Sequence, residues 1–360
     1  MPLLRHAWVI AFSALLVIEI GCGAPGVPLP PELELPKPVA DLHAQRKGSK
    51  VFLSWSVPAH TTDGRSIRRQ GDTQVCRSLT SPLEGCGIAI GTVSPSPASP
   101  SSGQSQASAT YNDTLPDQLQ REHPDGEAVY GVVALNAYGR SAGLSNPVEV
   151  PLAPTLPPPA NFSAQLQASG ILLTWAAASA PNIDGLRYTY RIYRREKGHA
   201  QETKISEQPL NGGASEFLDQ AFAWEKTYVY RITIATLVER ESVPEMQVEG
   251  DDSAELEVLA HDVFPPAVPA RLQAVASGVG QPPFIDLIWT PDNEADLAGY
   301  NIYRREEGGP EVRINSMVVQ APAYRDSSVV SGHRYFYSVA AVDQRGNESS
   351  RSNQASDSVP

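Results

Sequence analysis

The segment YRIYRREKG, residues 190–198, returns almost unchanged as YNIYRREEG, residues 300–308, about 110 positions later. Self-similarity at a fixed distance is the sequence signature of repeated structural units. Within the second copy, Tyr300 and Ile302 fall on one face of an extended strand and Tyr303 falls on the other. We therefore expect a chain built from similar units, each of which contains this strand.

A second strand, with a tryptophan at its end, recurs three times. Its apolar residues occupy every other position, which places them on one face and predicts a half-buried strand. The copies are Val51, Leu53 and Trp55; Ile171, Leu173 and Trp175; and Ile285, Leu287 and Trp289. A later alternating strand begins at Tyr228 in the second unit and at Tyr335 in the third, whereas the first unit aligns with Ala128.

An aspartate precedes each of these later strands. It stands two positions after an aromatic residue, and its side chain is expected to close a turn. The three aspartates are Asp113, Asp219 and Asp326.

The tryptophan strand, the tyrosine of the later strand and the unit length together resemble fibronectin type III domains. The resemblance implies an all-β fold of three tandem immunoglobulin-like seven-strand sandwiches that follow a signal peptide and a Pro-rich linker. It implies that Trp55, Trp175 and Trp289 lie in the cores. It also implies that Tyr228 and Tyr335 form tyrosine corners, in which the hydroxyl caps backbone at a sheet crossing.

The resemblance assigns residues 37–152, 153–262 and 263–360 to three domains. We expect the first domain to be irregular, because Ala128 lacks the hydroxyl of a tyrosine corner. The Ser- and Pro-rich residues 91–110 cannot supply the buried area that offsets ordering entropy, so they predict a long mobile loop.

The first 21 residues have the features of a signal peptide. Residues 7–18 form an apolar-rich run that is too short to cross a bilayer of about 30 Å. The tripeptide Gly21-Cys22-Gly23 follows and resembles the bacterial lipoprotein signal, with Glu19 where that signal usually has leucine. The resemblance implies that Cys22 is diacylated and becomes the new N-terminus. The alternative is secretory cleavage after Gly23.

Residues 22–36 form a Pro-rich linker. The stretch from Ala24 to Val39 holds six prolines and no plausible hydrophobic core. Such a segment should be extended and semi-rigid, at about 3 Å per residue. It is therefore expected to serve as a stalk between a surface and the domains.

The remaining cysteines, Cys76 and Cys86, could pair across the hairpin that follows the third strand of the first domain. Export permits a disulfide, and a loop this short would stabilise the fold by roughly 2–3 kcal/mol. The alternative is two buried free thiols. No nearby histidine supplies a Zn-like ligand set, so no metal site is expected.

Signals of catalysis are weak. The seven histidines are scattered, and the chain has no HExxH, Walker or GxGxxG motif. We therefore predict no catalytic residue, no cofactor and no enzymatic activity. The acidic residues 291–296 lack the spacing of a calcium loop and are expected to hydrogen-bond local backbone. Arg194-Arg195 and Arg304-Arg305 are each followed by glutamate, which favours solvated strand ends over a site for an anionic polymer.

The net charge of −12 argues against a nucleic-acid partner. We predict an exported, membrane-anchored lipoprotein at the outer membrane or cell surface, with a secreted protein as the alternative. Its expected role is a non-catalytic cell-envelope binding or spacing module, with the membrane and a protein or glycan ligand as partners. The alternative role is an accessory protein that presents carbohydrate to a separate hydrolase, for which Tyr193 and Tyr303 would form an exposed aromatic row.

Overall fold

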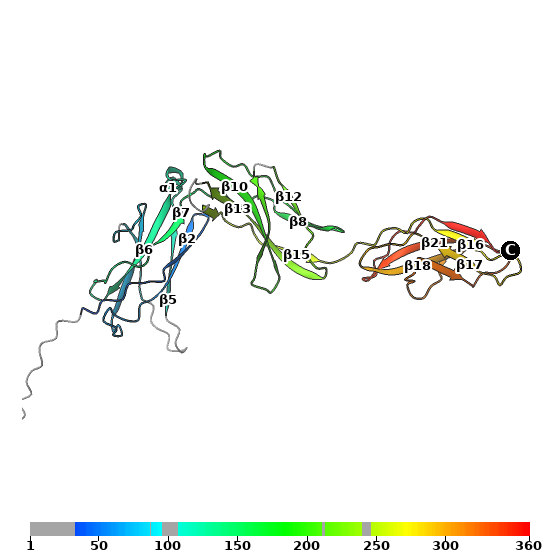
Figure 1. Ribbon diagram of the computed structural model, residues 1–360, viewed down its shortest axis with the longest axis horizontal. Helices are drawn as coiled ribbons and strands as arrows, with labels where there is room; N and C mark the ends of the chain where they lie inside the picture. The colour runs from blue at the N-terminus through cyan, green and yellow to red at the C-terminus, as the bar shows by residue number, and fades with distance from the viewer. Residues whose placement is uncertain (1–32, 87, 96–106, 211–212, 240–245) are drawn as a thin grey trace, which may run out of the picture. The chain divides into compact units, whose positions relative to one another are not determined.

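The computed structural model describes residues 33–86, 88–95, 107–210, 213–239 and 246–360. β-strands make up nearly all of the regular structure in these residues, together with the six-residue helix α1 (Asp117–Glu122) (Figure 1). In this part of the chain no helix is long and apolar enough to span a membrane. The all-β prediction is confirmed, while the predicted signal peptide and Cys22 lie outside the described residues.

The chain divides into two compact units whose segments alternate along the sequence. Among the described residues, unit 1 consists of 33–44, 53–86, 88–95, 107–111 and 129–149. Unit 2 consists of Gln45–Phe52, Asn112–Ala128 and Val150–Pro360. Both copies of the repeated nonapeptide therefore belong to unit 2.

The C-terminal part of unit 2 is a seven-strand sandwich. Its strands pair in the orders β16-β17-β20 and β19-β18-β21-β22. They are β16 (Gln273–Ala276), β17 (Ile285–Ile288), β18 (Leu297–Glu306), β19 (Glu311–Arg313), β20 (Ala323–Asp326), β21 (Arg334–Asp343) and β22 (Ala355–Ser358). The alternating residues of β17 and β18 meet in a core where Trp289 packs edge-on against Tyr300, with ring centroids 5.1 Å apart.

The middle part of unit 2 repeats this plan. One side of its core is the sheet β12-β9-β8, and the other is β11-β10-β13, to which β14 and β15 also pair through β13. The strands are β8 (Ser163–Gln167), β9 (Gly170–Thr174), β10 (Leu186–Glu196), β11 (Thr203–Pro209), β12 (Glu216–Asp219), β13 (Lys226–Val238), β14 (Met246–Glu249) and β15 (Leu256–Ala260). Trp175 packs against Tyr190 in this core, with ring centroids 5.3 Å apart.

Residues 43–151 contribute the remaining strands. One group extends the larger sheet in the order β14-β1-β2-β5, and the other forms the sheet β4-β3-β6-β7. Their bounds are β1 (His43–Lys47), β2 (Lys50–Ser56), β3 (Gln70–Ser78), β4 (Ile88–Val93), β5 (Ser108–Thr114), β6 (Glu127–Asn136) and β7 (Val148–Pro151). In β2 the alternating Val51, Leu53 and Trp55 are all buried, as the period-two pattern predicts for one face of a strand.

The loop expected at residues 91–110 is shorter than composition indicates. Residues 91–93 belong to β4 and residues 108–110 belong to β5. Cross-strand hydrogen bonding orders both ends of the expected loop. Their small residues lack the apolar alternation from which a strand is predicted. Residues 96–106 lie outside the described part of the chain.

The end of the expected linker is part of the folded structure. The Asn136 side-chain amide donates to the Leu33 carbonyl at 2.8 Å, and Pro36 forms a β-bridge with Thr61. The backbone N–H of Thr62 also donates to the Leu35 carbonyl at 2.9 Å. Proline content predicts an extended backbone here, but it does not predict which residues hydrogen-bond to that backbone.

A buried aspartate joins the two sheets of the middle sandwich. Asp219 ends β12, and its Oδ2 accepts hydrogen bonds from Arg194 of β10 at 2.7 Å and from the Tyr230 hydroxyl of β13 at 2.8 Å. Its Oδ1 accepts from the backbone N–H of Ala221, so it also closes the predicted turn. Burial, reinforced by the aspartate charge, raises the pKa of Tyr230, which therefore stays protonated and donates.

The C-terminal sandwich contains the same arrangement. Asp326 of β20 accepts from Arg304 of β18 at 2.8 Å and from the Tyr337 hydroxyl of β21 at 2.9 Å. The Asp326 carboxylate is 3% exposed, so these donors stand in for water. We call each Asp–Arg–Tyr set an inter-sheet clamp.

Removal of the carboxylate in Asp326→Ala should lower the free energy of unfolding of the C-terminal sandwich by about 3 kcal/mol, because Arg304 and Tyr337 lose their buried partner. Hydrogen exchange of the β21 amides measures this. Asp286→Ala is the matched control, because Asp286 lies on the same sandwich but pairs with Arg325 in an exposed position. Equal loss of protection in both variants would contradict the clamp.

Candidate functional site

The outward face of β10 carries a charged side chain that is almost fully buried. Tyr190 and Ile192 point into the core, so Arg191 and Tyr193 lie on the opposite face of the strand. Arg191 is nonetheless only 6% exposed. A buried guanidinium requires partners for its N–H groups, and these partners define the site.

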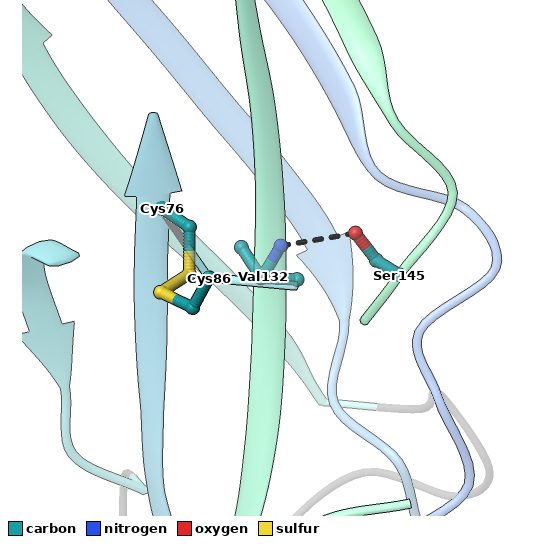
Figure 2. The surroundings of a disulfide bond; sticks show 4 residues. All are labelled: Cys76, Cys86, Val132 and Ser145. Carbon is teal, nitrogen blue, oxygen red and sulfur yellow. Dashed lines mark hydrogen bonds between the residues drawn. A yellow bond between two sulfur atoms is a disulfide. The ribbon is translucent and has the colours of Figure 1, made fainter. Parts of the chain in front are cut away.

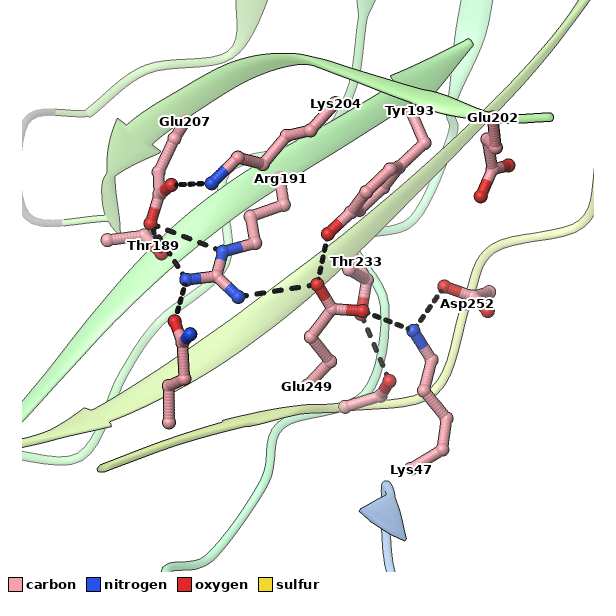
Figure 3. Close-up of polar contacts among 12 residues, drawn as sticks. Lys47, Thr189, Arg191, Tyr193, Glu202, Lys204, Glu207, Thr233, Glu249 and Asp252 are labelled. Atoms are coloured by element: carbon pink, nitrogen blue, oxygen red, sulfur yellow. Dashed lines mark hydrogen bonds and ion pairs between the residues drawn. The ribbon is translucent and has the colours of Figure 1, made fainter. Parts of the chain in front are cut away.

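Arg191 donates in three directions. Its Nε and Nη2 reach Glu207 of β11 at 3.2 and 2.9 Å, and its Nη1 reaches Glu249 of β14 at 3.3 Å (Figure 3). Nη2 also donates to the Gln247 side chain. These contacts hold the guanidinium plane in one orientation.

Tyr193 and Arg231 form the second part of the site. The Tyr193 hydroxyl donates to Glu249, and the Arg231 guanidinium lies over the Tyr193 ring at 3.9 Å from its centroid. Arg231 in turn pairs with Glu202, with its Nε 2.9 Å from Oε1, and with Asp252. The ring is thus covered on one face by a cation that is itself fixed.

Lys47, at the end of β1, completes the arrangement. Its Nζ lies 2.7 Å from Glu249 and 2.8 Å from Asp252. The adjacent Gly48 donates its backbone N–H to the Glu249 carbonyl at 2.8 Å and has a positive φ of 56°. A Cβ at Gly48 would lie 2.6 Å from an Asp251 carboxylate oxygen, so glycine allows this close approach.

The charges of this set balance. Its bases are Lys47, Arg191, Lys204 and Arg231, and its acids are Glu202, Glu207, Glu249 and Asp252. We call these eight residues, with Tyr193 and Gln247, the polar network. All ten lie in unit 2.

Two carboxylates of the polar network, those of Glu207 and Glu249, have lowered pKa values. Burial alone would raise the pKa of Glu249, but hydrogen bonds from Lys47, Tyr193 and Arg191 outweigh burial and lower it. At Glu207 burial is likewise outweighed, by hydrogen bonds from Lys204 and Arg191, and the pKa is lowered. General acid–base catalysis favours pKa values near the working pH, and these lowered values lie further from it.

An open cleft of about 510 Å³ adjoins the polar network. Its lining includes Phe52 of β2 and Gln247, together with the bases Arg46, Lys47, Arg191 and Arg231 and the acids Glu249 and Asp252. Phe52 is 42% exposed, which distinguishes it from the covered Tyr193.

In the C-terminal sandwich, Tyr303 corresponds to Tyr193 and is also covered by an arginine. The Tyr303 hydroxyl donates to Glu348 at 2.6 Å, and the Arg351 guanidinium lies over the ring at 3.2 Å from the centroid. Tyr193 and Tyr303 therefore do not offer the freely exposed row considered from the sequence. The covering arginines come from β13 and from the segment after β21, so strand periodicity does not reveal them.

The predicted disulfide between Cys76 and Cys86 is confirmed. It joins β3 to the turn before β4, with a Cα–Cα distance of 5.1 Å. Cys76 is fully buried beside β6, where the backbone N–H of Val132 donates to the Ser145 hydroxyl at 3.0 Å (Figure 2).

The tryptophans and corner tyrosines named from the sequence are all buried. Trp55, Trp175 and Trp289 are 3–5% exposed. The Tyr228 hydroxyl accepts from the backbone N–H of Ala223 at 3.0 Å, and the Tyr335 hydroxyl accepts from that of Val330 at 3.1 Å. These side chains hold the sandwiches together and take no part in the polar network.

The arginine pairs differ from the solvated strand ends expected. Arg194 and Arg304 hold the inter-sheet clamps, while Arg195 pairs with Glu255 at 2.9 Å. The clamp partner of Arg194 lies 25 residues away in sequence and on the other sheet, so the neighbouring glutamate is a misleading guide.

The acidic residues 291–296 contribute to two local arrangements. Asp292 accepts from the backbone N–H of Glu294 at 3.0 Å, as expected of a loop aspartate. Asp296 lies with Asp262 and Asp343, with one ligand-type oxygen from each within 4.8 Å of the others. Such oxygens suit a hard cation, but Arg345 and Asn347 already contact the group, through Asp262 at 4.0 Å and through Asp343 at 2.8 Å.

A serine motif also occurs at residues 139–143, where GRSAG has the G-x-S-x-G spacing. A nucleophile elbow requires a strand followed by a helix. Here the motif lies between strands β6 and β7. It therefore does not indicate a hydrolase.

No family model matches the chain. Three curated proteins called amylopullulanase match parts of it. The one from Thermoanaerobacterium thermosulfurigenes is 39% identical over 95 residues, which is 26% of this chain and 5% of the enzyme. Those from Thermoanaerobacterium saccharolyticum and Thermoanaerobacter thermohydrosulfuricus are 40% and 44% identical over 92 and 84 residues. The chain thus spans only 5–7% of the length of these relatives.

Two solved structures also match. An Fn3-like protein from Clostridium thermocellum is 31% identical, with a TM-score of 0.23, and the match covers 27% of this chain and 96% of that protein. The FN1–FN3 domains of chicken CNTN1 are 14% identical, with a TM-score of 0.25, and the match covers 90% of this chain and 99% of theirs.

Protonation of Glu249 should weaken the polar network. Its pKa is below the ordinary value of 4.5, so its charge stabilises the fold above that pH, and this stability is lost as the pH falls through the lower folded-state pKa. Glu249→Gln should therefore melt at a lower temperature than the parent protein at pH 7, and the difference should shrink as the pH falls below 4.5. Glu255→Gln, at an exposed pair, is the control. A gap that does not change with pH would contradict the assignment.

Proposed function

We propose that the chain is an exported, non-catalytic cell-envelope protein made of three tandem fibronectin type III-like modules and anchored through a lipid on Cys22. It acts as a binding and spacing module that holds a partner away from the membrane. The observation that carries this proposal is the Cys76–Cys86 disulfide in a chain of tryptophan-centred β-sandwiches.

The module count rests on the repetition of one core pattern. Trp175 and Trp289 each pack on the tyrosine that begins the repeated nonapeptide, Tyr190 and Tyr300, and Trp55 is buried at the corresponding position two residues after Leu53. We assign the modules to residues 37–152, 153–262 and 263–360. The contacts of residues 33–36 extend the first module slightly into the linker.

Export is supported by the disulfide. Structural disulfides persist in secreted and envelope proteins and are rare where glutathione and thioredoxin keep thiols reduced. The hydrophobic run before Cys22 has the length of a signal-peptide core. Secretion without an anchor is the alternative.

A non-catalytic role is supported by the electrostatics of the polar network. Its acids and bases neutralise one another, and the carboxylates of Glu207 and Glu249 have lowered pKa values. The likeness to amylopullulanases covers a small fraction of those enzymes and so supplies no activity for this chain.

The second candidate is an accessory protein that presents carbohydrate to a separate hydrolase. The amylopullulanase segments favour it, because they place similar sequences within enzymes of that name. Since Tyr193 and Tyr303 are each covered by an arginine, such a protein would need another contact surface.

Mass spectrometry of the mature protein should find Cys22 as the N-terminal residue, carrying a diacylglycerol group. Cys22→Ser should release the protein from the membrane fraction, because the lipid is its proposed anchor. Cys76→Ser with Cys86→Ser serves as the control for cysteine loss. An unmodified N-terminus at Ala24 would rule out the tether and favour secretion.

Pull-down from detergent-solubilised envelopes should recover a partner with the mature chain. Replacement of residues 96–106 by a short Gly-Ser segment, which leaves β4 and β5 intact, tests the long insertion of the first module as the contact element. Loss of the partner only in this variant would place binding there. Recovery of no partner by either protein would contradict the binding role and leave the spacer.

A further inference from the structure

We propose that the cleft bordered by Phe52, Arg191, Arg231, Gln247, Glu249 and Asp252 binds an uncharged saccharide. The inference rests on the binding role proposed above and identifies its site and ligand class.

The size of the cleft fits a small polar ligand. At about 510 Å³ it lies within the range of ligand pockets, roughly 300–1,000 Å³. Its lining is mostly polar and charged, which disfavours a lipid or a drug-like apolar molecule.

The charges of the cleft are held by fixed partners, which favours a neutral ligand over a free ion. Lys47, Arg191 and Arg231 each contact a carboxylate of the polar network. Arg46, which also lines the cleft, donates to the Gly48 carbonyl and to the Gln120 side chain. The chain carries a net charge of −12, which further disfavours a polyanion. Carboxylates accept hydrogen bonds and guanidinium groups donate them, and a sugar hydroxyl does both. Adjacent acids and bases therefore match adjacent hydroxyls.

The polar groups are already ordered. Arg191 is held by Glu207, Glu249 and Gln247, and Arg231 is held by Glu202 and Asp252. Fixed side chains lose little conformational freedom when a ligand binds, which lowers the entropic cost of association.

Phe52 provides the apolar contact. It lies on the outward face of β2, whose inward face holds Val51 and Leu53, and is 42% exposed beside the charged groups. An aromatic ring packs against the C–H face of a pyranose, while the polar groups bind the hydroxyls. Tyr193 cannot do this on the face that Arg231 covers.

Affinity electrophoresis of the mature chain in gels containing pullulan, galactomannan or xylan tests the proposal. At least one of these neutral polysaccharides should retard the protein. Phe52→Ala and Gln247→Ala should each weaken the binding about tenfold or more, because the first removes the apolar contact and the second removes a lining amide that also holds Arg191. Phe52→Tyr keeps the ring and should retain binding. Tyr138→Ala removes an aromatic side chain that is 73% exposed outside the cleft, and should bind like the parent protein.

Three outcomes would overturn the proposal: no retardation by any of the three polysaccharides, equal binding by Phe52→Ala and the parent, or stronger binding to anionic polygalacturonate than to the neutral polymers. Melting temperatures of the variants exclude unfolding as the cause of a loss. If the envelope pull-down still recovers a partner in any of these cases, the cleft assignment fails while the binding function stands.

Discussion

The clamp formed by a buried aspartate with an arginine and a tyrosine from the opposite sheet is the interaction on which each described sandwich of unit 2 depends. Apolar packing presses two sheets together without fixing their relative position, whereas Asp219 and Asp326 reach across from one sheet to defined donors on the other. Each aspartate also orders the turn after its strand. The clamp therefore links turn geometry, sheet alignment and core packing.

The face of β10 that points away from the core carries a second set of charged side chains. Because Tyr190 and Ile192 fill the core, Arg191 and Tyr193 must point outward, where strands β11, β13 and β14 supply acids and an arginine at matching register. The paired charges of the network hold the pKa values of Glu207 and Glu249 below their ordinary values and leave a polar cleft beside Phe52. The same pairing of charges underlies both proposals, a non-catalytic role and a binding cleft.

Much of the fold was predictable because its signals are local. Period-two alternation identified the strands of Trp55, Trp175 and Trp289, and a ten-residue separation made the Cys76–Cys86 bond plausible. The polar network was not predictable, because Lys47 and Glu249 are 202 residues apart and have no shared motif. Arg194 and Arg304 were assigned to solvent for a related reason, since their nearest acidic neighbours in sequence are not their partners.

The sequence by itself determined the β character, the repeated unit and the residues that fill its cores, because alternation and repetition are properties of neighbouring positions. Only the tertiary structure decided which charges meet, which tyrosines are covered and where a cleft remains. Those outcomes depend on strand register and on side chains brought together from distant segments. A one-residue change of register would move all the side chains of the shifted strand to the opposite face of the sheet.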